Sequence, residues 1–74
     1  MNVYVVTEDI PYDSNRIVGV CASLEGAKAL AEHSAGPGRR YQWEGQEEEQ
    51  RLTAARPDER FPDYFSVYRQ EVQP

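Results

Sequence analysis

Apolar and polar positions at the start of the chain follow the pattern of β-strands. Residues 2–7 are rich in β-branched and aromatic side chains and predict a first strand over about residues 2–8. Residues 16–22 predict a second strand, and the Pro, Asp, Ser and Asn residues between the two runs supply turn chemistry. Strict alternation divides the second strand into two opposed sets, Ile17, Gly19 and Cys21 against Val18, Val20 and Ala22. Since both strands carry apolar residues on both sides, we expect both of their faces to be buried.

The segment that follows the second strand has helical spacing. Ser23 is a suitable N-cap, because its hydroxyl can accept a hydrogen bond from a backbone N–H of the first turn. Small apolar residues recur at helical spacing from Leu24 onward, and Gly36 followed by Pro37 is a typical C-terminal stop. The pattern predicts a helix over about residues 24–35 with a narrow apolar stripe.

The second half of the chain predicts two more strands, separated by a long polar segment. The strands cover about residues 40–44 and 63–72, and in each of them aromatic side chains share one face. The intervening segment, 45–62, contains strong helix formers but almost no apolar residues to bury. We therefore expect it to be a mobile loop with at most one helical turn.

These elements predict a single α+β domain over residues 1–74, with a four-stranded, mainly antiparallel sheet and one helix on one face, in the order ββαββ. One short helix covers only one face, and we expect Phe65 and Val67 to meet it. The other face then forms an interface of aromatic residues and neighbouring arginines, namely Tyr41, Trp43, Tyr64, Tyr68, Arg39 and Arg40. The alternative is that the segment 45–62 folds over this face.

Composition narrows the class of protein further. A chain of 74 residues has room for one domain with a thin core, since a domain of this size buries only about 60% of its unfolded surface. Cys21 is the only cysteine, and its apolar neighbours predict a buried, unreactive thiol in a reducing compartment. No apolar run is long enough to span a bilayer, and none has the flanks of a signal peptide. We expect a cytoplasmic protein that adds to its thin core by forming a homodimer through the open sheet face.

Three short stretches resemble a group of small uncharacterised proteins from actinobacteria and their phages. They are VYVVTE at residues 3–8, IVGV at 17–20 and an S-x-E-x-A helix start at 23–27. The chain differs from that group at Cys21, where an aromatic residue is more usual, and in its long segment before the last strand. The resemblance implies a ββαββ fold and brings no known activity with it.

Candidate chemistry is sparse in this chain. Cys21 and His33 are the only thiol and imidazole, and they lie on different predicted elements, so we expect no catalytic site and no enzyme. One Cys and one His cannot supply the usual zinc ligands. The acidic residues around Asp9 and Asp13 lack the spacing and glycine of a calcium-binding EF-hand, so we also expect no metal site and no cofactor.

The acidic charge bears on the choice of partner. A net charge of −5 and a pI near 4.7 repel a phosphate backbone, so we expect no nucleic acid partner although arginines and aromatics interleave. The acidic run 44–49 could imitate phosphates, but a solvated loop explains it equally well. We expect a non-catalytic binding module, a small acidic accessory or inhibitory protein of phage type that acts through its sheet face on a protein partner. The alternative is a small-ligand or nucleotide-binding protein with a pocket between protomers, lined by Tyr, Trp and Arg39 or Arg40.

Overall fold

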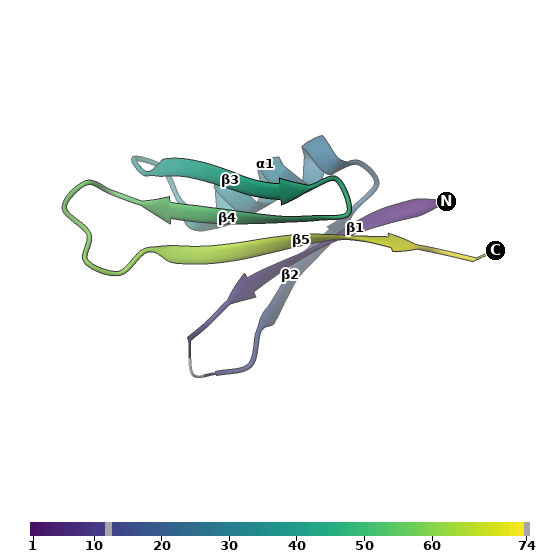
Figure 1. Cartoon of the computed structure of the whole chain (residues 1–74), viewed down its shortest axis with the longest axis horizontal. Coiled ribbons are helices and arrows are strands. Elements are labelled where there is room, and N and C mark those ends of the chain that lie inside the picture. The colour runs from purple at the N-terminus through teal and green to yellow at the C-terminus, as the bar shows by residue number, and fades with distance from the viewer. Residues whose placement is uncertain (12, 74) are drawn as a thin grey trace.

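A five-stranded antiparallel sheet carries one helix on one of its faces in the computed structural model, which describes residues 1–11 and 13–73 (Figure 1). The elements in chain order are β1 (Asn2–Asp9), β2 (Arg16–Cys21), α1 (Leu24–Ala35), β3 (Arg40–Gln46), β4 (Glu49–Ala55) and β5 (Asp63–Glu71). The expectation of an α+β fold with an antiparallel sheet and one helix is therefore confirmed, whereas the number of strands differs.

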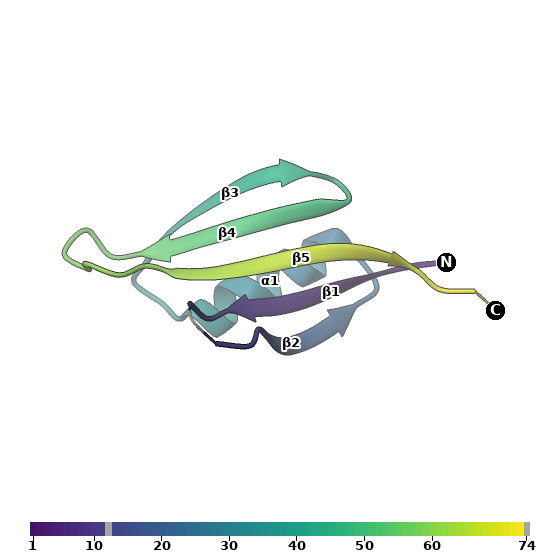
Figure 2. The same cartoon turned by 60° about the horizontal axis from the view of Figure 1, so that its bottom comes forward.

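The strands lie in the order β2-β1-β5-β4-β3, so the last strand of the chain is the middle of the sheet (Figure 2). β5 pairs with β1 from Asn2↔Glu71 to Asp9↔Tyr64, and the two ends of the chain meet where the Val72 N–H donates to the Met1 carbonyl at 2.7 Å. β2 and β3 are left as the two edge strands.

The prediction of a mobile loop over 45–62 is wrong, because β4 lies within this segment. Leu52 and Ala54 are two positions apart, so on a strand they point to the same face, and both are fully buried there. Two apolar residues are enough because β3 and β5 supply hydrogen bonds on either side. The turn from β3 into β4 requires Gly45, whose φ is 118° and whose missing Cβ would lie 2.4 Å from the Glu49 carbonyl oxygen. The fold is therefore ββαβββ.

The helix has the ends that the sequence predicts. The Ser23 hydroxyl accepts from the Gly26 N–H at 3.0 Å, and Gly36 ends the helix with a φ of 97° while its N–H donates to the carbonyls of Glu32 and His33. Ala27 and Ala31 are fully buried against the sheet. Because these side chains are small, the helix lies close to the strands.

The core lies between α1 and the sheet, and Phe65 and Val67 belong to it as expected. Its buried apolar residues are Tyr4, Val6, Ala27, Ala31, Leu52, Ala54, Phe65 and Val67. Tyr4 and Val6 of β1 point to the helix, so Val3 and Val5 point to the other side of the sheet.

A β-bulge changes the alternation predicted for β2. Val6 pairs with Gly19 while Thr7 pairs with Ile17, so two residues of β2 occupy one step of the ladder. Ile17 consequently leaves the face of Gly19 and Cys21 and joins Val20 on the side away from the helix. These two side chains are 68% and 58% exposed, so the expectation that both faces of this strand are buried is wrong.

Candidate functional site

The face of the sheet turned away from α1 has no element of the described chain above it (Figure 1). We call this surface the open face, and the strand registers place its side chains in rows. One row crosses β2, β1, β5 and β4 as Val20, Val5, Tyr68 and Glu49. The next crosses all five strands as Ile17, Thr7, Ser66, Arg51 and Glu44. The open face thus has an apolar half, formed by Ile17 and Val20 of β2 with Val5 and Tyr68, and a polar half over β4 and β3, with Thr7 and Ser66 between them.

A cluster of polar side chains lies at the centre of the open face. Ser66 is a buried residue with 1% exposure, and its hydroxyl donates to Asp9 Oδ2 at 2.5 Å. Thr7 Oγ1 donates to Asp9 Oδ1 at 3.2 Å, and Arg51 Nε lies 3.9 Å from Asp9 Oδ2. Because the Asp9 carboxylate is already engaged by three side chains, the cluster holds strands β1, β4 and β5 in place.

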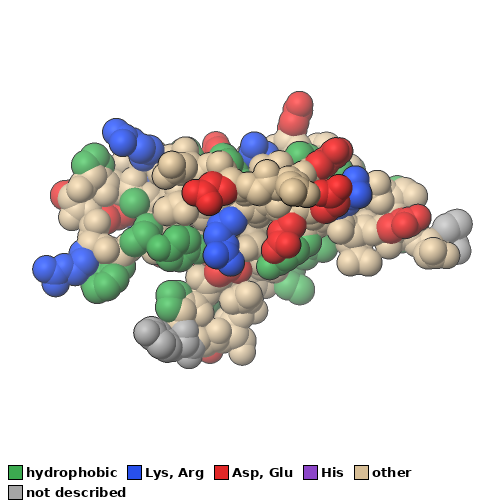
Figure 3. All heavy atoms as spheres, viewed as in Figure 1, with side chains coloured by type: hydrophobic (Ala, Val, Ile, Leu, Met, Phe, Trp, Pro, Cys, Tyr) green, Lys and Arg blue, Asp and Glu red, His purple; other side chains and the backbone are tan. Residues whose placement is uncertain are grey.

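Aromatic and aliphatic side chains surround this polar centre. Tyr64 and Tyr68 lie two positions to either side of Ser66 on the same face of β5. Both rings are half-buried, and Val5 lies across the strand pair from Tyr68. Figure 3 shows hydrophobic side chains on both sides of a basic one near the middle of this face.

Acidic side chains gather at the end of the open face near the turn between β3 and β4 (Figure 3). An open hollow of about 500 Å³ lies there, and its lining residues are Glu44, Gly45, Gln46, Glu48, Glu49 and Arg51. Three carboxylates against one guanidinium make the hollow acidic. A smaller hollow of about 180 Å³ lies beside the polar cluster, lined by Asp9, Ile10, Pro11, Arg51 and Tyr64.

Two of the predicted interface aromatics lie on the helix side of the sheet and not on the open face. Tyr41 pairs with Ala54 and Trp43 with Leu52, and both partners are buried under the helix. Trp43 Nε1 donates to Glu32 at 2.9 Å, and Tyr41 donates through its hydroxyl to the Gly36 carbonyl. The expectation that Tyr41 and Trp43 share a face with Tyr64 and Tyr68 is therefore wrong. β3 pairs with β4 and not with β5, and this pairing determines which face of the sheet the two aromatic side chains occupy.

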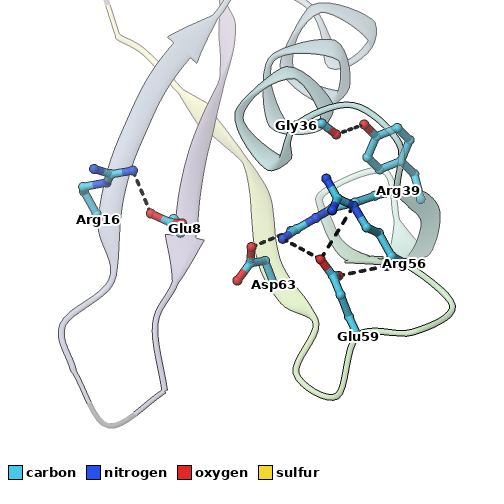
Figure 4. A network of polar contacts seen from close by, with 8 residues as sticks. Glu8, Arg16, Gly36, Arg39, Arg56, Glu59 and Asp63 are labelled. Atoms are coloured by element: carbon cyan, nitrogen blue, oxygen red, sulfur yellow. Dashed lines mark hydrogen bonds and ion pairs between the residues drawn. The ribbon is translucent and has the colours of Figure 1, made fainter.

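The two predicted arginines also separate. Arg39 Nη1 donates to Asp63 at 2.5 Å, and its Nη2 lies 3.1 Å from Glu59, which also accepts from the Arg56 backbone N–H at 2.8 Å (Figure 4). The hydrogen bond to Asp63 raises the pKa of the Arg39 guanidinium, while burial opposes this shift. Arg39 thus joins the start of β3 to the segment before β5. Arg40 is exposed on the open face, opposite Ala55.

Several residues of the open face were not identified from the sequence. Asp9, Ser66 and Arg51 form its polar centre, and the spacing Tyr64–Ser66–Tyr68 was the available signal, since it puts one hydroxyl between two rings.

Cys21 is half-buried and not fully buried, and it faces the helix side opposite Tyr4.

The comparison with protein families gives a match over almost the whole chain. The model of a domain of unknown function, DUF7336, matches residues 1–73. The chain belongs to this family. A search of curated proteins and a search of solved structures each returned no match for the DUF7336 chain. Among its described residues, this DUF7336 domain has no helix long and apolar enough to cross a membrane, and no three His, Cys, Asp or Glu side chains are placed so that together they could hold a metal ion.

Proposed function

We propose that this DUF7336 domain is a non-catalytic binding module, a small acidic accessory or inhibitory protein that docks on a protein partner through its open face. The observation that carries the proposal is the bare apolar half of that face, where Ile17 and Val20 are 68% and 58% exposed beside Val5 and Tyr68. Covering apolar surface contributes about 25 cal/mol per Å², so a partner that fits this half gains affinity from it.

The acidic hollow specifies the chemistry of the partner. Glu44, Glu48 and Glu49 line one end of the open face, and the whole chain carries a net charge of −5. A partner with apolar side chains at its centre and Lys or Arg beside them complements both parts of the surface. The positive charge of such a partner also raises the rate of its association with the acidic domain, and added salt weakens this effect.

The polar cluster supports binding by keeping the open face rigid. Ser66 and Thr7 both donate to the Asp9 carboxylate, and the Ser66 bond joins β5 to β1, so the strands beneath the two tyrosines are fixed before a partner arrives. A surface ordered in advance loses less conformational entropy on association.

The small-ligand alternative has less support, because the side chains it needs already bind within the chain. Trp43 is held by Glu32 and has the Lys28 ammonium 4.9 Å from its ring centroid, while Arg39 is held by Asp63 and Glu59. We therefore retain the protein partner alone.

We further propose that the module works in the cytoplasm, with the half-buried free thiol of Cys21 as support, since a reducing compartment keeps such a thiol free. The actinobacterial or phage setting implied by the sequence resemblance stays a prediction.

A peptide-display selection against the immobilised domain tests the docking surface. We expect enrichment of segments in which Lys or Arg flank apolar or aromatic residues, with binding that weakens as salt increases. Tyr68→Thr should reduce their binding about tenfold or more, because it removes a ring from the apolar half of the open face while keeping a strand-forming residue.

Phe61→Thr is the matched control, since Phe61 is an aromatic residue of similar size that is 80% exposed in the segment between β4 and β5. Its binding should equal that of the unmodified domain. The proposed function is wrong if no basic-apolar segments are enriched, or if Tyr68→Thr binds them as well as Phe61→Thr does.

A further inference from the structure

Within residues 1–11 and 13–73, no strand lies beside the outer edge of β3 (Figure 2). β3 pairs with β4 without a break from Arg40↔Ala55 to Gln46↔Glu49, so it is a regular strand. Alternate N–H and C=O groups along its outer side are consequently available to another strand. The other edge, β2, contains the bulge at Val18 and Gly19, which disrupts a regular ladder.

The side chains of β3 complement those of a second β3 that runs in the opposite direction. Its first five residues are Arg40, Tyr41, Gln42, Trp43 and Glu44. When two such strands run antiparallel with Gln42 opposite Gln42, each Arg40 faces a Glu44 and each Tyr41 faces a Trp43. We propose that two copies of this chain pair in this register, so that one sheet continues across a two-fold axis.

Charge on the open face favours this register. Arg40 and Glu44 are both exposed, and both point to the open face. Neither forms an ion pair within the part of the chain that the structure describes. Directly opposed residues of an antiparallel pair have Cβ atoms about 4.5–5.5 Å apart, so the dimer gains two symmetry-related Arg–Glu pairs.

The helix side of the edge fits the same arrangement. Tyr41 and Trp43 are half-buried, and their hydrogen bonds to Gly36 and Glu32 fix the rings before pairing. Aromatic pairs across strands stabilise a sheet, and this register forms two of them. A groove of about 460 Å³ lies between α1 and this edge, lined by Ala29, Glu32, His33, Gly36, Pro37 and Tyr41, and it leaves space for the second copy.

Other registers lose these contacts. A slip of one residue brings side chains of opposite faces together. Centring the pair on Trp43 places Arg40 opposite Gln46 and Tyr41 opposite Gly45, which removes the ion pairs and leaves a single Trp43–Trp43 contact in place of the two Tyr41–Trp43 pairs. The register centred on Gln42 matches every side chain from 40 to 44 when the second strand is β3 of another copy.

Sedimentation velocity over a micromolar concentration series tests the pairing. The unmodified chain should form dimers. Glu44→Arg puts Arg opposite Arg40, and Arg40→Glu puts Glu opposite Glu44, so each variant alone should weaken dimerisation about tenfold or more. An equimolar mixture of the two variants should form a heterodimer, because every opposed pair is then of opposite sign. The double variant with both changes should again form homodimers.

Glu47→Arg provides the control, since it makes the same charge change in the turn outside the paired residues. It should dimerise like the unmodified chain. A monomer at all concentrations overturns the proposal, as does a mixture that dimerises no better than the two variants alone, or a double variant that stays monomeric. This inference goes beyond the docking function, and Tyr68→Thr, which weakens partner binding, should leave the dimer intact.

Discussion

Arg39 and Arg40 are adjacent in the sequence and have opposite surroundings. The side chain of Arg39 is 17% exposed and joins Asp63 and Glu59, whereas Arg40 is exposed to solvent on the open face. Alternation along the backbone turns one guanidinium toward the end of the sheet and leaves the other free for association. One arginine therefore contributes to the fold, and we assign the other to the contact between copies.

Replacement of Arg39 by glutamine tests the first of these roles. Arg39→Gln removes the cation that joins Asp63 to Glu59 and leaves only Arg56 beside Glu59, and it should lower the free energy of unfolding by about 1 kcal/mol, a value reduced for the partial exposure of Asp63. Because folding raises the pKa of Arg39, loss of the guanidinium proton does not remove this stabilisation at any pH below the ordinary arginine pKa. Urea unfolding with Arg60→Gln as an exposed control measures it. An equal effect of the two changes would show that the Arg39 contacts do not stabilise the fold.

At the scale of elements, β4 decides the architecture. It carries two buried apolar residues, Leu52 and Ala54, and it separates β3 from β5 in the sheet. This position determines that Tyr41 and Trp43 face the helix. β3 lies beyond β4 at the edge of the sheet, where the proposed contact between copies forms.

Truncation of Leu52 tests whether β4 belongs to the core. Leu52→Ala removes a fully buried side chain and should destabilise the fold by about 2–4 kcal/mol, whereas Thr53→Ala, on the open face of the same strand, should cost less than about 1 kcal/mol. Thermal and urea unfolding measure both. Two small and equal effects would indicate that the segment is a loop, as its polar composition suggests.

At the scale of the whole molecule, a single helix packs against a sheet of five strands. The helix covers one face, and the other face shows an apolar half and an acidic end. With extents of 46 × 25 × 19 Å the molecule is thin, so a large part of its sheet lies at the surface. Small domains have a narrow margin of stability, and association is one means of widening it.

Association and folding should therefore be linked. If two folded copies bind each other and unfolded chains do not, the melting temperature of the unmodified chain should rise with protein concentration. Glu44→Arg should reduce this dependence, because its dimer is weaker. Scanning calorimetry at several concentrations measures both chains. A rise of the same size in Glu44→Arg would place the contact somewhere other than the β3 edge.

The sequence alone determined the elements whose signals are local. The cap at Ser23, the stop at Gly36 and the spacing of small residues between them define α1, and runs of β-branched residues define β1 and β2. These signals are local because each depends on hydrogen bonds and side-chain contacts within a few residues. Alternation along β5 likewise puts Phe65 and Val67 on one face and Tyr64 and Tyr68 on the other, since this grouping needs no partner strand.

Only the tertiary structure decided the contacts between distant segments. The polar segment 49–55 is a strand because β3 and β5 supply its hydrogen bonds. No pattern within the segment itself indicates those bonds. The same pairing fixed the face of Trp43, and pairing with β1 placed the bulge that turns Ile17 to the open face. Strand order and register depend on partners far away in the chain, and for this reason alternation gave two faces without showing which one the helix covers.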